Sequence, residues 1–207
     1  MFLKKFALAL ALALTALSVP AQAAGPKQTV AVAPLSSIEV QDLTYMREEE
    51  KLARDIYLKL DGQWGLVPFA NVSAGEQNHM DAVLKLLRKY RLPDPAAGLL
   101  IGEFANSELQ ALYDKLLEQG LLTNIDALKV GGVIEEADIL DLADAMAHAD
   151  NVDLDVLYGN LQCGSRNHLR AFAGWLQAIT GQAYQAQVIA QEDVDAILAT
   201  AREKCGR

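Results

Sequence analysis

Apolar residues recur at three- and four-residue intervals through most of the chain after residue 38, and this spacing predicts α-helices. Strict alternation of apolar and polar residues is scarce, as are runs of β-branched residues, so strands are not expected. Helices are predicted over residues 39–60, 73–91, 107–120, 125–147, 154–180 and 191–203. Glycine follows several of these segments as a termination signal, and Pro93-Asp94-Pro95 ends the second.

Four of the predicted helices are long and amphipathic, and the shorter helix at 107–120 connects the second to the third. This order describes an all-α four-helix bundle with one crossover helix and a short C-terminal helix. Residues 38–207 are long enough to form one domain with a proper core.

Several ionisable residues lie on the faces of these helices that should be buried. In the first helix Glu49 lies near the middle of the apolar face and Glu50 at its edge, while Glu48 is expected to face water. Glu50 can also pair with Arg54 one turn later on the surface, which favours Glu49 as the inward-facing residue.

The other three long helices each place two polar residues, three positions apart, within the apolar face. These pairs are Glu76 and His79, Glu135 and Asp138, and Ser165 and His168. Glu136 points roughly away from the face that carries Glu135.

Burying one unpaired carboxylate is costly, so several acids in one core require a common explanation. A bound cation would neutralise several of them at once, whereas a mutually hydrogen-bonded polar core without metal is the alternative. We favour a metal site made by Glu49, Glu76, His79, Glu135, Asp138 and His168.

An internal repeat supports this interpretation. Gly75-Glu76-Gln77-Asn78-His79 matches Gly164-Ser165-Arg166-Asn167-His168, with Gly, Asn and His at the same offsets. Two similar helical hairpins predict a core with approximate twofold symmetry, which can present two metal ions.

At these residues the sequence resembles the ferritin-like superfamily, whose di-iron sites take a Glu from each of two helices and a Glu-x-x-His from each of the other two. The stretches MREEEKLARDIYLKL, FANVSAGEQNHMDAVLKLL, GGVIEEADILDL and GSRNHLRAF resemble an uncharacterised family of prokaryotic ferritin-like domains, over about residues 38–200. The resemblance implies a ferritin-like fold and a di-iron centre.

Ser165 departs from the pattern, because it occupies the position of the Glu in the second Glu-x-x-His. Asp138 could supply the missing acid, and without it a single-metal site becomes plausible.

Carboxylate and imidazole ligands suit iron, manganese or zinc. We therefore expect a non-haem di-iron oxidoreductase acting on Fe(II), oxygen or peroxide, of ferroxidase or peroxidase type. One alternative is an iron-sequestering protein without turnover, and another is an interaction bundle whose polar core fixes helix register. Tyr57 and Tyr158 are expected on core-facing positions, either as electron relays or as ordinary core aromatics.

The N-terminus predicts export. Lys4 and Lys5, an apolar run over residues 6–19 and Ala21-Gln22-Ala23 form a Sec-type signal peptide over residues 1–23, cleaved after Ala23. The run is shorter than the roughly 20 residues of a spanning helix, so no membrane attachment is expected after cleavage. Residues 24–37 are predicted to be a flexible leader, and the mature protein should be periplasmic or secreted.

Cleavage would remove two lysines and no acid, which leaves 16 Lys and Arg against 27 Asp and Glu, a net charge of −11. Such a chain is a poor candidate for binding nucleic acid.

The two cysteines of the chain, Cys163 and Cys205, do not form a zinc-ribbon or haem-attachment pattern. Export favours a disulfide between them, and the alternative is a free thiol near the C-terminus.

Overall fold

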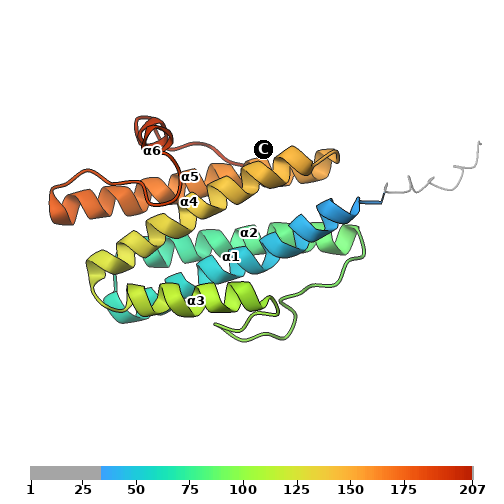
Figure 1. Cartoon of the computed structure of the whole chain (residues 1–207), viewed down its shortest axis with the longest axis horizontal. Helices are drawn as coiled ribbons and strands as arrows, with labels where there is room; N and C mark the ends of the chain where they lie inside the picture. The colour runs from blue at the N-terminus through green and yellow to red at the C-terminus, as the bar shows by residue number, and fades with distance from the viewer. Residues whose placement is uncertain (1–33, 207) are drawn as a thin grey trace, which may run out of the picture. The chain divides into compact units, whose positions relative to one another are not determined.

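The computed structural model describes residues 34–206, which form six α-helices and no β-strand (Figure 1). The all-helical prediction is therefore confirmed for this part of the chain.

The predicted signal peptide, 1–23, and most of the predicted leader, 24–37, lie outside the described residues. None of the described helices combines the length and the apolar character that a membrane span requires. The helices are α1 (Ser37–Trp64), α2 (Val67–Lys89), α3 (Ser107–Gly120), α4 (Asn124–His148), α5 (Val152–Thr180) and α6 (Gln191–Leu198).

The helix ends show where the predicted boundaries were wrong. Helix α1 continues past Gly62 and ends at Trp64, where Gly65 caps it with a φ of 61°, the left-handed conformation that glycine adopts easily. Helix α2 begins at Val67 rather than Ser73, because Pro68 in the first helical turn has no hydrogen bond to lose. Helix α6 ends at Leu198 rather than residue 203.

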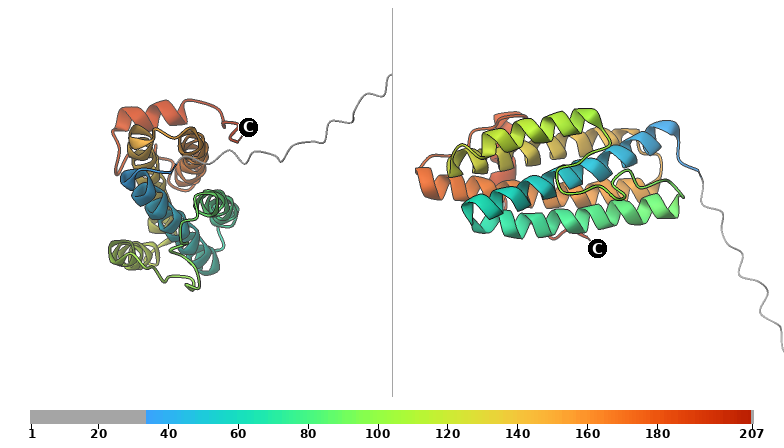
Figure 2. Two further views of the ribbon diagram at one scale, coloured as in Figure 1. Left: turned by 90° about the vertical axis from the view of Figure 1, so that its right-hand side faces the viewer. Right: turned by 90° about the horizontal axis from the view of Figure 1, so that it is seen from below.

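The four long helices form two hairpins, α1 with α2 and α4 with α5, that face each other (Figure 2). Helix α1 contacts α4 and helix α2 contacts α5, so two seams run between the hairpins. Helix α3 packs on α1 and α4, and helix α6 touches α5 (Figure 1).

Two hydrophobic clusters fill the space between the long helices. Tyr57, Phe69 and Phe172 pack together in one cluster, and Leu142 and Tyr158 belong to the other. On α1, α2 and α5 the buried residues Glu49, Glu50, Glu76 and Ser165 come between the positions that supply the two clusters, and on α4 Glu135 and Asp138 precede Leu142 of the second cluster. The polar residues therefore form a layer with hydrophobic packing on both sides.

A second face of α1 is also charged and buried, and it fastens the segment between α2 and α3. Glu48, which was expected to face water, is buried and accepts hydrogen bonds from the backbone N–H groups of Ala105 (2.6 Å) and Asn106 (3.2 Å). Arg47 forms an ion pair with Asp94, which lies in the same segment between α2 and α3. The prediction for Glu48 was wrong because the segment that covers it is distant in sequence.

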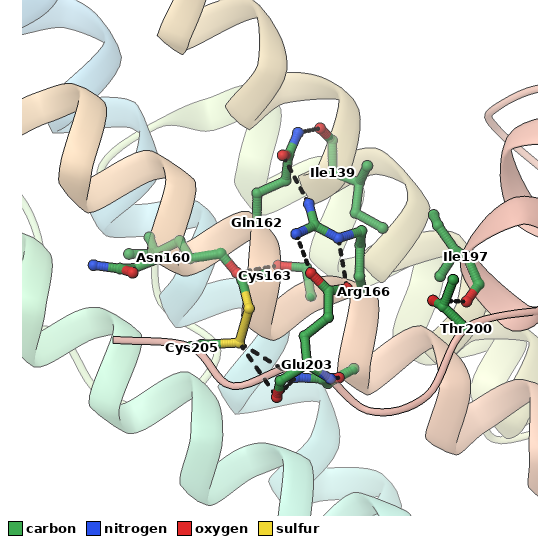
Figure 3. A network of polar contacts seen from close by, with 12 residues as sticks. Ile139, Asn160, Gln162, Cys163, Arg166, Ile197, Thr200, Glu203 and Cys205 are labelled. Carbon is green, nitrogen blue, oxygen red and sulfur yellow. Dashed lines mark hydrogen bonds and ion pairs between the residues drawn. A yellow bond between two sulfur atoms is a disulfide. The ribbon is translucent and has the colours of Figure 1, made fainter. Parts of the chain in front are cut away.

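The chain after α5 folds back along that helix (Figure 3). Cys163 and Cys205 form a disulfide, which answers the question the sequence left open. Glu203 adds ion pairs to Arg166 and Arg170, with the shorter N–O distance, 2.5 Å, to Arg166. We refer to residues 199–206 as the C-terminal strap.

Candidate metal centre

Glu76 of α2 lies between two histidines at the middle of the polar layer. Its Oε2 is 2.8 Å from Nδ1 of His79, one turn further along α2. Its Oε1 is 2.7 Å from Nδ1 of His168 on α5. Ligand atoms of all three residues lie within 4.8 Å of one another, which is close enough to bind one cation.

Each histidine also approaches a carboxylate from the other side of the layer. His79 Nδ1 is 3.1 Å from Oε2 of Glu50 on α1, and His168 Nδ1 is 3.4 Å from Oε2 of Glu135 on α4. The prediction that Glu50 forms a surface pair with Arg54 was wrong: Glu50 is buried, and Arg54 bonds Asp55 and Gln77 instead. An acid from each of α1 and α4 thus faces a histidine from α2 or α5.

Asp138 lies against Ser165, the residue at which the sequence departs from the ferritin-like pattern. The Ser165 hydroxyl donates a hydrogen bond to Oδ2 of Asp138, across the contact between α4 and α5. Both residues are buried, and Ser165 also donates to the carbonyl oxygen of Leu161 within its own helix. Asp138 therefore brings a carboxylate from α4 to the place on α5 where the resemblance would put a glutamate.

The layer contains several buried polar atoms without a hydrogen-bond partner among residues 34–206. They are Glu49 Oε2, Glu50 Oε1, Glu76 Oε1, Asp138 Oδ1 and His168 Nδ1. Glu76 Oε1 and His168 Nδ1 are close together but do not align as a hydrogen bond. Orphaned buried oxygens are costly in a protein interior, and a cation among them would satisfy several at once. The donor set therefore fits a metal that prefers oxygen and imidazole ligands.

The repeated glycines explain how the histidines reach this position. A Cβ atom on Gly164 would lie 2.3 Å from Nε2 of His79, and one on Gly75 would lie 2.7 Å from Nε2 of His168. Each copy of the Gly-x-x-Asn-His repeat therefore makes room for the histidine of the other copy. This reciprocal contact turns both Nδ1 atoms toward the carboxylates.

The two imidazoles and Glu76 stabilise each other's charged forms. Burial alone would raise the pKa of Glu76, but the charges of His168 and His79 outweigh it and hold that pKa well below its usual value. Burial alone would lower the pKa values of the histidines. The surrounding carboxylates raise them instead, for His168 to about 10.

The outer acids show the opposite behaviour. Burial, followed by repulsion from Glu76, raises the pKa of Glu135 to about 8 and that of Asp138 to about 7. Burial and the charge of Asp138 likewise raise the pKa values of Glu49 and Glu50 well above their usual range. Without a cation these acids tend to hold protons, and a bound cation would displace them.

The two tyrosines that the sequence placed in the core have different environments. The Tyr57 hydroxyl donates to Glu135 Oε1 at 2.6 Å and so touches the centre directly. The Tyr158 hydroxyl has no hydrogen-bond partner among the described residues, and Tyr158 belongs to a hydrophobic cluster. Only Tyr57 is in contact with the candidate site.

Most of the predicted site residues lie together. Glu76 contacts His79 and His168, Glu135 contacts His168, and Asp138 is buried in the same layer with its hydrogen bond from Ser165. Glu49 is buried beside Asp138 and contacts neither histidine. The sequence favoured Glu49 over Glu50, whereas Glu50 is the residue that faces His79; its position next to Glu49 at the edge of the apolar face was a signal.

Glu136 lies outside the centre, as its position on the helix predicted. It is nonetheless fully buried under the segment after α5. Its carboxylate accepts hydrogen bonds from the Tyr184 hydroxyl (2.6 Å) and from the backbone N–H groups of residues 187–189, which compensate for the burial. It therefore fixes the segment after α5 to helix α4.

Comparison with known proteins gives relatives without an assigned activity. Residues 39–201 match the family described as an uncharacterized protein domain, DUF2202. The chain is 46% identical over 179 residues to an uncharacterized protein of Methanocaldococcus jannaschii, MJ0754, covering 86% of this chain and 94% of that protein. The crystal structure of the hypothetical protein MJ0754 superimposes with a TM-score of 0.80 at 45% identity, covering 87% of this chain and all of that one.

Proposed function

The chain belongs to the DUF2202 family, and we propose that this member is an exported ferritin-like metal-binding protein with a non-haem di-iron centre. One observation carries the proposal. Glu76 lies between His79 and His168 and is surrounded by buried carboxylates from α1 and α4, several of which have oxygens without a hydrogen-bond partner among the described residues.

The contacts divide the ligands into two groups that share Glu76. Glu50 and His79 would hold one ion, and Glu135 and His168 the other. Asp138, held by Ser165, and Glu49 beside it would complete the carboxylate set. This assignment keeps the predicted ligands and adds Glu50.

The arrangement of the helices supports a ferritin-like bundle. Two hairpins face each other, the shorter helix α3 lies in the connection between them, and each hairpin supplies one histidine and its facing acid. The repeated Gly-x-x-Asn-His sequence gives these hairpins their approximate symmetry.

The residues of the centre have distinct roles in this proposal. Iron held by carboxylates and imidazoles supplies redox chemistry with oxygen or peroxide. The histidines are only 14% and 15% exposed in their side chains, so the hairpins limit access of water. Tyr57 holds Glu135 in place through its 2.6 Å hydrogen bond. The outer acids give up protons when the cation binds.

Anaerobic loading with Fe(II) followed by oxygen or peroxide tests this function. We expect two irons per chain and an absorption change that recurs after each re-reduction. Two irons per chain without redox turnover would support an iron-sequestering protein instead. A chain that binds no iron, manganese or zinc would contradict the metal site and favour a polar core that only fixes helix register.

A further inference from the structure

Helix α4 carries an acid at every third position from the centre outward: Glu135, Asp138, Asp141 and Asp144. Three residues advance an α-helix by about 4.5 Å and turn the side chain by about 300°, so successive acids move steadily around the helix. Glu135 and Asp138 are buried, Asp141 is half-buried and Asp144 is exposed. The row therefore leads from the candidate metal centre to the surface.

A small pocket lies at the outer end of this row, where α4 meets α1. Its volume is about 210 Å³, and it is lined by Asp141, Asp144 and His148 of α4 and by Asp42 of α1, among others. His148 Nδ1 lies 3.1 Å from Asp42 Oδ2, which leaves Asp141 and Asp144 without an ion-pair partner among the described residues. The pocket therefore carries excess negative charge.

Glu49 connects the pocket with the centre. It is 92% buried, since its exposed fraction is 8%, and its Oε2 has no hydrogen-bond partner among residues 34–206. It lies one helical turn along α1 from Tyr45 and Met46, which line the pocket, and it belongs with Asp138 to the buried polar layer around the centre. A buried carboxyl group whose oxygen has no partner is stabilised either by taking up a proton or by binding a cation.

The seam between α2 and α5 has a different character. The pocket at its surface, of about 570 Å³, is lined by His168 and by the cationic residues Arg170 and Arg202, together with neutral side chains. Arg170 is paired with Glu203, but Arg202 has no ion-pair partner among the described residues, and because no acid lines this pocket it does not attract cations as the acidic pocket does. The two seams of the molecule are therefore not equivalent for a charged ligand.

We propose that the α1–α4 seam is the entry route for hydrated divalent cations, which Asp141 and Asp144 collect and Glu49 passes to Asp138. This inference rests on the proposed metal site and adds the path by which the site is filled. Acids at the mouth of a cleft raise the local concentration of cations and their rate of association.

Cobalt(II) loading of the metal-free full chain tests the route, because cobalt(II) does not require oxygen and its binding is visible by absorption. We compare the variant D141N/D144N with the control variant D114N/E118Q, which also removes two negative charges, but from the exposed surface of α3. At low ionic strength the D141N/D144N variant should load about tenfold more slowly than wild type. Its final cobalt stoichiometry should be unchanged, and the D114N/E118Q variant should load at nearly the wild-type rate.

Added salt should slow the wild type more than the D141N/D144N variant, because salt screens the charges at the mouth. Equal loading rates in the two variants, with full stoichiometry, would overturn the route and leave the metal site standing. Loss of bound cobalt in D141N/D144N would also overturn it, since these acids would then be ligands. A wild-type chain that binds no cobalt would overturn the proposed metal site itself.

Discussion

At the scale of single residues, two neighbouring glutamates on α4 have opposite roles. Glu135 faces His168, whereas Glu136 accepts hydrogen bonds from the segment after α5. Adjacent positions on a helix point about 100° apart, so one residue step separates the candidate centre from a purely structural contact. Burial alone therefore does not identify a ligand.

Replacing Glu76 with glutamine should abolish metal uptake, because the amide keeps the size of the side chain but loses the charge that faces both histidines. Glu136→Gln should keep full metal stoichiometry. It should lower the free energy of unfolding by about 1–3 kcal/mol, as expected when a buried hydrogen-bonding group loses its partners. Equilibrium dialysis with elemental analysis measures the first effect and chemical denaturation the second. Equal loss of metal in both variants would refute the assignment of these two faces.

Tyr57 and Tyr158, both fully buried, offer a matched comparison. Tyr57→Phe removes the donor to Glu135 Oε1 and should lower the free energy of unfolding of the metal-free protein by about 1–3 kcal/mol. Tyr158→Phe should leave stability unchanged or slightly increase it, because its hydroxyl has no partner among the described residues. Urea denaturation measures both. A larger loss in Tyr158→Phe than in Tyr57→Phe would contradict this description of the core.

At the scale of helices, periodicity was enough to predict the main elements, but only some of the contacts in the polar layer. Glu76 and His79 share one helix face, so their proximity follows from spacing alone. The contacts of Glu48 and Glu50 could not be predicted in this way. They depend on how closely α2 and the segment before α3 approach α1, which no local pattern encodes.

The reciprocal packing of glycine and histidine predicts a defect specific to the centre. Alanine at position 75 or 164 would push the facing imidazole away from its carboxylates. Because the obstructed atom is at the end of a side chain, Gly75→Ala and Gly164→Ala should cost little more than about 1–3 kcal/mol of stability. We expect metal affinity to fall about 10- to 100-fold, as when other residues that orient a ligand are changed.

Gly174 provides the control, since it also lies in α5 and a Cβ there would meet no atom within 4 Å. Gly174→Ala should leave metal affinity unchanged and raise stability by up to about 1 kcal/mol through helix propensity. Isothermal titration with cobalt(II) and thermal unfolding measure both quantities. If Gly164→Ala bound metal as well as Gly174→Ala, the glycine would not be positioning the histidine.

At the scale of the whole molecule, the contacts between segments distant in sequence were the hardest to predict. The expected export favoured a disulfide without deciding against a free thiol, and the sequence does not show that Glu203 pairs with both Arg166 and Arg170. The last helix was predicted to reach residue 203, whereas the C-terminal strap is not helical and its residues find their partners on the folded α5 (Figure 3).

The strap should respond to acid through Glu203. Hydrogen bonds from Arg166, which outweigh the effect of burial, and from Arg170 lower the pKa of Glu203 from 4.5 to about 2 in the folded protein. Because the pKa of Glu203 is lower in the folded protein, the stabilising contribution of this carboxylate is fully present above pH 4.5 and is lost as the pH falls from 4.5 toward 2.

The wild type should therefore unfold at a higher temperature than Glu203→Gln above about pH 5, and this difference in unfolding temperature should shrink as acid is added. Thermal unfolding of both proteins with the disulfide intact, at a series of pH values, measures the difference. A difference that stayed constant down to pH 2 would show that the carboxylate charge of Glu203 does not hold the strap.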